Sequence, residues 1–236
     1  MRCSIVMPAL NEGEQITKVL AHLKEFVAIE FECLVVVDDV SDSTVSHVLE
    51  FSKSDERFKV VYNNGKSGPA SAIKAGISSA RSSTIVVTMA DDSDDFRDIE
   101  KLVYLIERGI HIACASRYMP TGQQIGAPIF KSFLSRYAGK SLYFFAKVDT
   151  RDATNSFKAY SREFLDAVDI EASHGFEMGL EMIAKARRNG FLIAEIPTIW
   201  IDRKVGQSNF NIMKWLPSYL RWYFYAFGIG RERLRR

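Results

Sequence analysis

The sequence predicts an α/β protein with a mostly parallel sheet and helices on both of its faces. Short apolar runs alternate with segments of helical spacing through the first half of the 236 residues. These runs lack the apolar–polar alternation of half-buried strands, which is typical of strands that are covered on both faces. Polar residues follow several of the runs directly, and ligands of parallel sheets bind at that edge.

The strands and helices of the first half are expected in strict alternation. The strands are expected at residues 3–9, 32–39, 58–63, 83–90 and 110–117. The helical segments are expected at residues 12–27, 41–54, 64–81 and 96–109, the third after a glycine-rich loop. Since a helical segment separates each strand from the next, the strands are expected to run parallel and the helices to cover the sheet.

The second half is less regular. Its helical segments are expected at residues 129–148, 161–170 and 175–190. Residues 152–161 are interpreted as irregular, and a strand is expected at 191–202. Pro197 lies inside that strand, which indicates an edge position or a bend because proline cannot donate to a sheet ladder.

Composition excludes several classes of protein. The residues are 47% hydrophobic and 25% charged, as in ordinary globular domains, and the net charge of +2 gives no electrostatic case for nucleic-acid binding. Cys3, Cys33 and Cys114 lie in strand-like contexts, which suits reduced thiols in the cytoplasm and not a disulfide framework. No window reaches the roughly 18 apolar residues of a membrane span. The composition does not set the oligomeric state.

A cluster of aspartates follows the fourth predicted strand, in the stretch VTMADDSDDF at residues 87–96. Asp92 and Asp94 have a D-x-D spacing, so in an extended chain both carboxylates point the same way and can converge on Mg²⁺ or Mn²⁺. A cation held so keeps positions open for substrate phosphates. Alternatively, Asp94, Asp95 and Asp98 begin a helix, where the dipole favours acids. The spacing alone leaves both interpretations open.

Eight motifs occur in a characteristic order: SIVMPALNE, ECLVVVDDVSDST, NNGKSGPASAIKAG, VTMADDSDDF, ASRY, DATNSFKAYS, GFEMGLEMI and IDRKVGQS. This order resembles the dolichyl-phosphate mannose synthases and related polyprenyl-phosphate glycosyltransferases, which belong to the inverting glycosyltransferase family 2 with the GT-A fold. The resemblance spans about residues 3 to 209. The first half alone indicates only family 2, and the second half selects the lipid-phosphate group. The implied fold is a Rossmann-like, mostly parallel sheet flanked by helices.

The resemblance implies three groups of site residues. The nucleotide site would be lined by Pro8, Asn11, Glu12, Asp39, Lys66 and Asp91. The divalent metal on the diphosphate would be held by Asp92 and Asp94. The phosphates of the sugar donor and the lipid acceptor would be contacted by Arg117, Lys131, Ser135, Arg203 and Ser208. The catalytic group within these sets would comprise Asp92, Arg117, Lys131 and Arg203.

The chain departs from the family pattern at two of these places. Ala90 stands at the first aspartate of the D-A-D motif, which leaves open whether Asp91 substitutes for it. Lys131 stands where arginine is common, so the charge is kept and the bidentate fork is lost.

The implied activity is the metal-dependent, inverting transfer of a hexose from a nucleotide-diphosphate sugar to a polyprenyl or dolichyl phosphate. GDP-mannose is the first expectation for the donor and UDP-glucose the second. A lipid phosphate is already an anion at neutral pH, so it needs cations to position it and no base to deprotonate it. Asp152 is interpreted as a site organiser, while Glu177 and Glu181 remain further candidates for a base. The alternatives are transfer to a saccharide hydroxyl, or an inactive nucleotide-sugar-binding protein, which Ala90 favours.

The chain is divided into a glycosyltransferase domain at residues 1–210 and an amphipathic helical tail at 211–236. The tail contains the stretch IMKWLPSYLRWYFYAF, in which tryptophans and tyrosines alternate with Lys214 and Arg221. Such a helix can lie on a membrane surface, or it can pack on its own domain or on a second subunit. A lipid acceptor favours the membrane. The expected location is therefore the cytoplasm, peripherally at the cytoplasmic face of the membrane.

Overall fold

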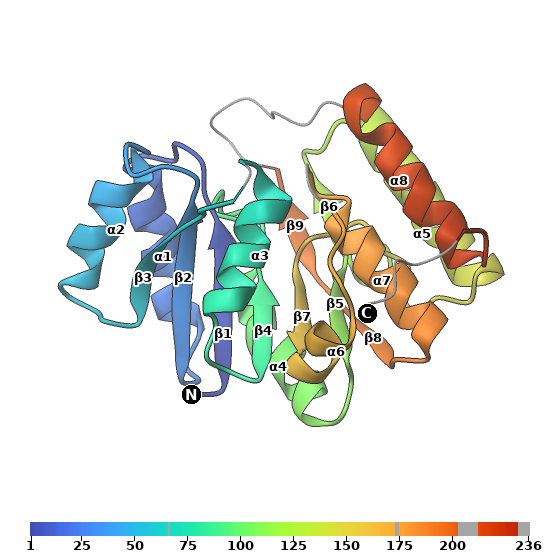
Figure 1. Cartoon of the computed structure of the whole chain (residues 1–236), viewed down its shortest axis with the longest axis horizontal. Helices are drawn as coiled ribbons and strands as arrows, with labels where there is room; N and C mark the ends of the chain where they lie inside the picture. Colours follow the sequence, from blue (N-terminus) through green and yellow to red (C-terminus); the bar gives the residue numbers. More distant parts are fainter. Residues whose placement is uncertain (66, 173–174, 203–211, 231–236) are drawn as a thin grey trace.

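A seven-stranded sheet runs through the molecule (Figure 1). The computed structural model describes residues 1–65, 67–172, 175–202 and 212–230, except for the side chains at 130–131 and 212–215. The strands are β1 Cys3–Pro8, β2 Phe31–Val37, β3 Phe58–Tyr62, β4 Thr84–Val87, β5 Ile112–Ser116, β7 Lys158–Ser161 and β8 Ile193–Pro197. Their order is β3-β2-β1-β4-β7-β5-β8, and only β7 runs antiparallel to its neighbours. The expected mostly parallel α/β class is confirmed.

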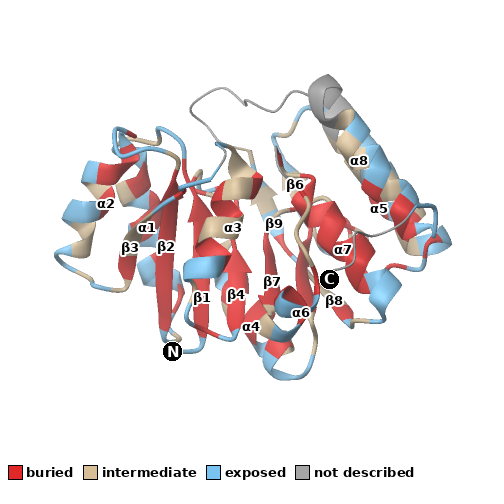
Figure 2. Ribbon diagram, in the orientation of Figure 1, coloured by how far each residue is buried: buried red, intermediate tan, exposed pale blue. Residues whose placement is uncertain are grey.

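Helices cover both faces of the sheet. One face carries α1 Gln15–Phe26, α2 Thr44–Ser52 and α4 Ile99–Glu107, which follows the short 3₁₀ helix η1 Phe96–Asp98. The other face carries α3 Pro69–Ser79, α6 Arg162–Ala167 and α7 Met178–Asn189. Along β1, Ile5 and Met7 pack in the first of these layers and Val6 in the second. Because both faces are covered, every residue of the central strands β1, β2, β4 and β5 is buried, as the continuous apolar runs predict (Figure 2).

Two long helices lie at the end of the molecule beyond α7 (Figure 1). They are α5 Ile129–Phe145 and α8 Ile212–Ala226. The hydroxyl groups of Ser141 on α5 and Tyr223 on α8 are 2.8 Å apart and form a hydrogen bond. Trp222 and Tyr225 of α8 are buried, so the helix packs on the domain with one face. Within the described residues, neither of these helices nor any other combines the length and apolar character needed to span a bilayer.

Two segments differ from the sequence prediction. Residues 158–161, interpreted as irregular, form β7 between β4 and β5. The strand expected at 191–202 ends at Pro197, and the chain continues as β9 Ile199–Ile201. β9 leaves the main sheet and pairs with β6 Gln123–Ile125. Pro197 therefore marks a bend, and β8 is an edge strand, so both properties expected from this proline are present.

Candidate active site

The carboxyl ends of β1, β2, β4 and β5 meet at one edge of the sheet. β7 runs the opposite way, so its first residue, Lys158, lies at this edge as well. The predicted site residues Pro8, Asp39, Asp91 and Arg117 all follow or end these strands. The topology therefore gathers residues that are far apart in the sequence, as expected for a ligand site of a parallel sheet.

The loop after β1 is held to the start of α2. Asn11 has a left-handed backbone with φ of 54°, a conformation that asparagine tolerates better than most residues. Its backbone N–H donates to the carboxylate of Asp42 at 2.9 Å, and the N–H of Glu12 donates to the Thr44 hydroxyl at 3.1 Å. Pro8 is buried at the end of β1. These contacts fix the loop that carries three of the predicted nucleotide-site residues.

The two aspartates after β2 have different surroundings. Asp38 accepts hydrogen bonds from the Asn63 side chain at 2.7 Å and from the Gly68 backbone at 2.9 Å, so it anchors the loop before α3. Asp39 is exposed and accepts from the backbone and the hydroxyl of Ser41. These two hydrogen bonds hold the pKa of Asp39 below its ordinary value. Asp39 is therefore an exposed, charged acceptor at the end of β2, and its nucleotide role stays a prediction.

The acidic stretch after β4 separates its carboxylates. The Asp94 carboxylate is buried and accepts from the Thr88 hydroxyl at 2.9 Å and from the Met89 backbone at 3.1 Å. Asp92 has a left-handed φ of 59°, and its carboxylate lies 2.9 Å from Nδ1 of His22 on α1. The Asp92 side chain is 41% exposed. The extended conformation that would align Asp92 with Asp94 is therefore absent, and the two side chains have different partners.

Asp91 is the neighbour that acts on Asp94. Burial, and then the charge of Asp91, raise the pKa of Asp94 to about 7. A buried carboxylate whose charge is disfavoured by a neighbouring aspartate fits a divalent cation, which prefers oxygen ligands and offsets the negative charge. No group of three or more His, Cys, Asp or Glu side chains is arranged around a metal site within the described residues. Two carboxylates still suffice for Mg²⁺ or Mn²⁺ when substrate phosphates and water complete the shell.

Asp95 and Asp98 lie at the helix start that follows. Asp95 is the N-cap of η1 and accepts from the backbone N–H of Arg97 at 3.1 Å. Asp98 forms an ion pair with Lys101 at 2.8 Å. The helix-start interpretation of the acidic stretch thus describes these two residues.

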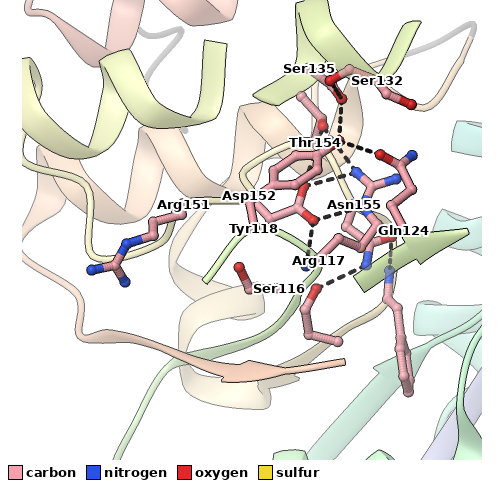
Figure 3. Close-up of polar contacts among 12 residues, drawn as sticks. Ser116, Arg117, Tyr118, Gln124, Ser132, Ser135, Arg151, Asp152, Thr154 and Asn155 are labelled. Atoms are coloured by element: carbon pink, nitrogen blue, oxygen red, sulfur yellow. Dashed lines mark hydrogen bonds and ion pairs between the residues drawn. The ribbon is translucent and has the colours of Figure 1, made fainter. Parts of the chain in front are cut away.

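An ion pair between Arg117 and Asp152 occupies the centre of the site (Figure 3). Nε and Nη2 of Arg117 donate to the two carboxylate oxygens at 2.7 and 2.8 Å, and the backbone N–H of Arg117 adds a third bond at 3.0 Å. Burial alone would raise the pKa of Asp152, but the adjoining guanidinium outweighs it and holds that pKa below its ordinary value. Asp152 is therefore a fixed anion that orients Arg117.

A buried lysine, Lys158, lies beneath this pair. Its ammonium group donates to the backbone carbonyl groups of Ala153 and Asn155. Burial lowers the pKa of Lys158. The Asn155 side chain donates to the carbonyl of Ala115 at 2.9 Å and so ties this loop to β5. Lys158 was not foreseen from the sequence, because a single lysine in a segment interpreted as irregular gives no sign of burial.

α5 contacts the site through its inner face (Figure 3). The hydroxyl of Ser135 is hydrogen-bonded to the hydroxyl of Tyr118, which also donates to Gln124 at 3.1 Å. The Arg117 guanidinium lies 5.0 Å from the centre of the Tyr118 ring. Ser135 is thus linked to the neighbour of Arg117 through Tyr118, a contact that the sequence did not reveal, and its phosphate role stays a prediction.

The two glutamates of the α7 region behave differently. Glu181 accepts from the backbone of Glu171 and Ala172 and pairs with Lys185 at 2.9 Å, which makes it a structural carboxylate. Glu177 is buried, and its Oε2 has no hydrogen-bond partner within the described part of the chain. Glu177 is therefore the carboxylate of this pair with an unbonded oxygen in the described part of the chain.

Four predicted site residues cannot be placed. Lys66, Arg203 and Ser208 lie outside the described residues, as does the side chain of Lys131. Their assignments stay predictions.

The fold is an α/β sheet that gathers charged side chains at the carboxyl edge of its strands. The family model for glycosyl transferase family 2 matches residues 4–169. The chain therefore belongs to glycosyl transferase family 2, and the expectation of a glycosyltransferase is confirmed.

Individual relatives agree with this assignment. Glycosyltransferase AglD of Haloferax volcanii is 31% identical over 205 residues, which is 84% of this chain and 32% of that protein, so this chain spans about a third of its length. Polyprenol monophosphomannose synthase of Mycolicibacterium smegmatis is 28% identical over 216 residues, covering 89% of this chain and 81% of that protein.

The solved structures support the fold. Glucosyl-3-phosphoglycerate synthase from Mycobacterium tuberculosis, in complex with Mn²⁺, uridine diphosphate and glucosyl-3-phosphoglycerate, matches with a TM-score of 0.72. The match covers 97% of this chain and 81% of that one at 16% identity. The expected GT-A-like architecture, a mostly parallel sheet flanked by helices, is confirmed.

Proposed function

We propose that this chain transfers a hexose from a nucleotide-diphosphate sugar to a polyprenyl phosphate, with inversion at the anomeric carbon. GDP-mannose is the first donor to test, because a relative that matches along most of the chain is named a polyprenol monophosphomannose synthase. UDP-glucose is the second, because the structural neighbour was crystallised with uridine diphosphate. The observation that carries the proposal is the ion pair of Arg117 with Asp152.

This ion pair suits a phosphate acceptor better than a hydroxyl acceptor. A hydroxyl needs a carboxylate base, whereas a phosphate monoester has a second pKa of about 6 and is an anion at neutral pH. Asp152 is held as the counterion of Arg117, and its lowered pKa makes it a weak base. Arg117 retains Nη1, the guanidinium nitrogen that Asp152 does not bind, for an incoming phosphate oxygen. Asp152 thus positions Arg117, and Arg117 orients the acceptor for in-line attack.

We propose Asp91 and Asp94 as the carboxylates that hold Mg²⁺ or Mn²⁺. The different partners of Asp92 and Asp94, and the effect of the Asp91 charge on the pKa of Asp94, support this pair over the D-x-D pair expected from the sequence. When bound, the cation would offset negative charge on the leaving diphosphate. Asp91 would thereby replace the aspartate that Ala90 lacks.

A peripheral location at the cytoplasmic face of the membrane completes the proposal. The three cysteines are free and buried, and burial raises the pKa of Cys114 to about 12, so its thiol stays protonated and inert. This state fits a reducing compartment. The exposed apolar side chains Leu220 and Phe224 of α8, with Phe227 just after it, support contact of this C-terminal segment with the lipid surface.

Product formation tests the proposed reaction. The purified protein is incubated with GDP-mannose or UDP-glucose, Mn²⁺ and a short polyprenyl phosphate, with the matching polyprenol as the control acceptor. A glycolipid is expected from the phosphate alone. Arg117→Ala should reduce the rate by at least about a hundredfold, as expected for loss of a group that orients and neutralises phosphate. Arg57→Ala, which removes an arginine paired with Asp55 away from the site, serves as the control.

Donor binding tests the metal ligands separately. Asp91→Asn and Asp94→Asn are expected to abolish the Mn²⁺-dependent part of nucleotide-sugar binding, measured by calorimetry. Asp92→Asn is expected to keep it, because this carboxylate is directed to His22. Loss of the metal effect in Asp92→Asn and Asp94→Asn, but not in Asp91→Asn, would restore the assignment of Asp92 and Asp94.

Glu177 supports a second candidate function, transfer to a saccharide hydroxyl. Its buried carboxylate with an unbonded Oε2 has the chemistry of a general base. In that case Glu177→Gln would abolish transfer to a saccharide and leave donor binding intact. If neither acceptor class yields a product with either donor, the remaining candidate is a nucleotide-sugar-binding protein without transfer.

A further inference from the structure

We propose that Trp200 is a positioning residue that, together with Tyr118, holds the guanidinium plane of Arg117 for an acceptor phosphate. Trp200 lies on β9, in a segment where the sequence indicates only a strand. Its effect on the acceptor rests on the proposed function, which makes that acceptor a phosphate. The contact of Trp200 with Arg117 does not depend on that function.

The guanidinium group of Arg117 has an anion at its edge and aromatic rings over its plane. The carboxylate of Asp152 accepts from Nε and Nη2 at 2.7 and 2.8 Å. Cζ of Arg117 lies 5.0 Å from the ring centre of Tyr118 and 5.9 Å from that of Trp200. A planar guanidinium within about 6 Å of an aromatic face is attracted to it and stacks on it. The carboxylate therefore fixes the edge of the group, and the two rings fix the tilt of its plane.

The two-stranded ribbon of β6 and β9 presents Trp200 on one of its faces. Trp200 pairs in register with Gln124 on β6, and Gln124 accepts from the hydroxyl of Tyr118 at 3.1 Å. Both side chains of this pair point to the same face, because successive side chains alternate along each strand. Ile199 and Ile201 point to the opposite face and border a cavity of about 310 Å³ beside the acidic stretch. One face of the ribbon is therefore turned to the arginine and the other to the acidic stretch.

Backbone hydrogen bonds hold β9 in this place. The N–H of Thr198, just before β9, donates to the carbonyl of Ser116 at the end of β5 at 3.1 Å. Within β9, the N–H of Ile201 donates to the carbonyl of Ser93 at 3.1 Å. The N–H of Ser93 in turn donates to the carboxylate of Asp91 at 3.2 Å. The strand that carries the tryptophan is therefore bonded both to the strand of the arginine and to the loop of the proposed metal ligands.

Loss of the Trp200 ring has a specific consequence. Arg117 keeps its ion pair with Asp152, so its charge and its place in the fold remain. The tilt of the guanidinium plane is then set by Tyr118 alone, and Nη1 no longer points in a fixed direction. Affinity for a phosphate falls although the charge is kept, because hydrogen bonds weaken steeply when donor and acceptor lose alignment. Trp200 thus acts on the acceptor through Arg117.

Calorimetric titration of the full chain with geranyl phosphate tests this role, with geraniol as the control ligand. Trp200→Ala is expected to weaken the binding of geranyl phosphate about tenfold, because the stacked ring is lost. Trp200→Phe keeps an aromatic face and should stay within about threefold of the wild type. Ile199→Ala removes a side chain from the opposite face of the same strand and should bind like the wild type. Wild-type affinity in Trp200→Ala would overturn the proposal, as would a wild type that binds geranyl phosphate no more tightly than geraniol.

A second background shows whether Trp200 acts through Arg117. In Arg117→Lys the charge remains but no planar group is left to stack, so adding Trp200→Ala should change the affinity for geranyl phosphate by less than about twofold. A tenfold loss in this background as well would show that Trp200 acts on the ligand or the fold directly, which overturns the positioning role. These titrations use no sugar donor and no turnover. An absent glycolipid product would therefore count against the proposed function and leave this inference standing.

Discussion

The two halves of the molecule bury charge in different ways. Among the described residues before Arg117, the buried charged side chains are all acidic: Glu32, Asp42, Asp94 and Asp98. From Arg117 onward they include basic side chains as well: Arg117, Asp152, Lys158, Glu177, Glu181 and Lys185. The first half satisfies its carboxylates with backbone N–H groups, hydroxyls and cations whose ends reach solvent. The second half keeps cations inside as well, where the loss of a partner costs more stability.

The largest effect is expected at the central ion pair. Asp152→Ala leaves Arg117 buried without a counterion, and removal of one partner of such a pair costs about 3–5 kcal/mol. Urea denaturation measures the loss in the free energy of unfolding. The double variant Arg117→Met/Asp152→Leu should recover most of it without recovering transfer. A loss below about 1 kcal/mol in Asp152→Ala would mean that water reaches Arg117 and that the contrast between the halves is smaller than we infer.

In the first half, Asp94→Asn is expected to stabilise the metal-free protein. The folded pKa of Asp94 is raised from 3.8 to about 7, so its charge destabilises the fold progressively as the pH rises between these values. The asparagine keeps an acceptor for Thr88 and Met89 and has no charge. The gain should be absent near pH 4 and reach roughly 4 kcal/mol above pH 7 in urea titrations with EDTA. A gain independent of pH would contradict the assignment to this carboxylate.

Glu32 tests a buried carboxylate whose charge stabilises the fold, in contrast to Asp94. The expected change in the free energy of unfolding is smaller. Burial would raise the pKa of Glu32, but hydrogen bonds from Arg81, Ser4 and Lys59 outweigh it and bring that pKa below 4.5. Its charge therefore stabilises the fold above pH 4.5, and this contribution is lost as the pH falls through the lower folded value. Glu32→Gln should cost about 1 kcal/mol at neutral pH, since the cationic partners are themselves exposed. The wild type and variant should converge in acid, which unfolding monitored across pH checks.

The smallest effect is expected at the surface. Arg2 and Glu107 form the same two-bond fork as Arg117 and Asp152, but their side chains are 43% and 37% exposed. Water and salt screen such a pair, so Arg2→Ala should leave the urea midpoint within error of the wild type. A shift as large as that of Asp152→Ala would show that fork geometry, and not burial, sets the energetic difference.

Much of the fold was predictable because it depends on local pattern. The strands β1 to β5 are apolar runs bounded by helices, and the pattern identified each of them within a few residues of its ends. β7 was missed because four residues, KAYS, begin with a lysine and carry no strand periodicity. The pairing of β7 with β4 and β5 depends on residues more than forty positions away, which a local pattern does not report.

The candidate site was predictable in part. The positions of Asp39 and Arg117 at strand ends follow from the α/β alternation. The sequence also indicates an organising role for Asp152, but it does not identify Arg117 as its partner. The spacing of Asp92 and Asp94 indicated two convergent carboxylates only for an extended chain, whereas φ at Asp92 is positive. The left-handed backbone at Asp92 depends on tertiary contacts such as that of its carboxylate with His22.

The antiparallel strand β7 has a consequence for the order of synthesis. The ribosome delivers β4 and β5 first, but in the finished sheet they lie on either side of a strand that emerges later. Until Ser161 has left the exit tunnel, the edges of both strands lack a partner, and open edges invite association with other chains. A nascent chain stalled before Lys158 should therefore require a chaperone that one stalled after Ser161 does not.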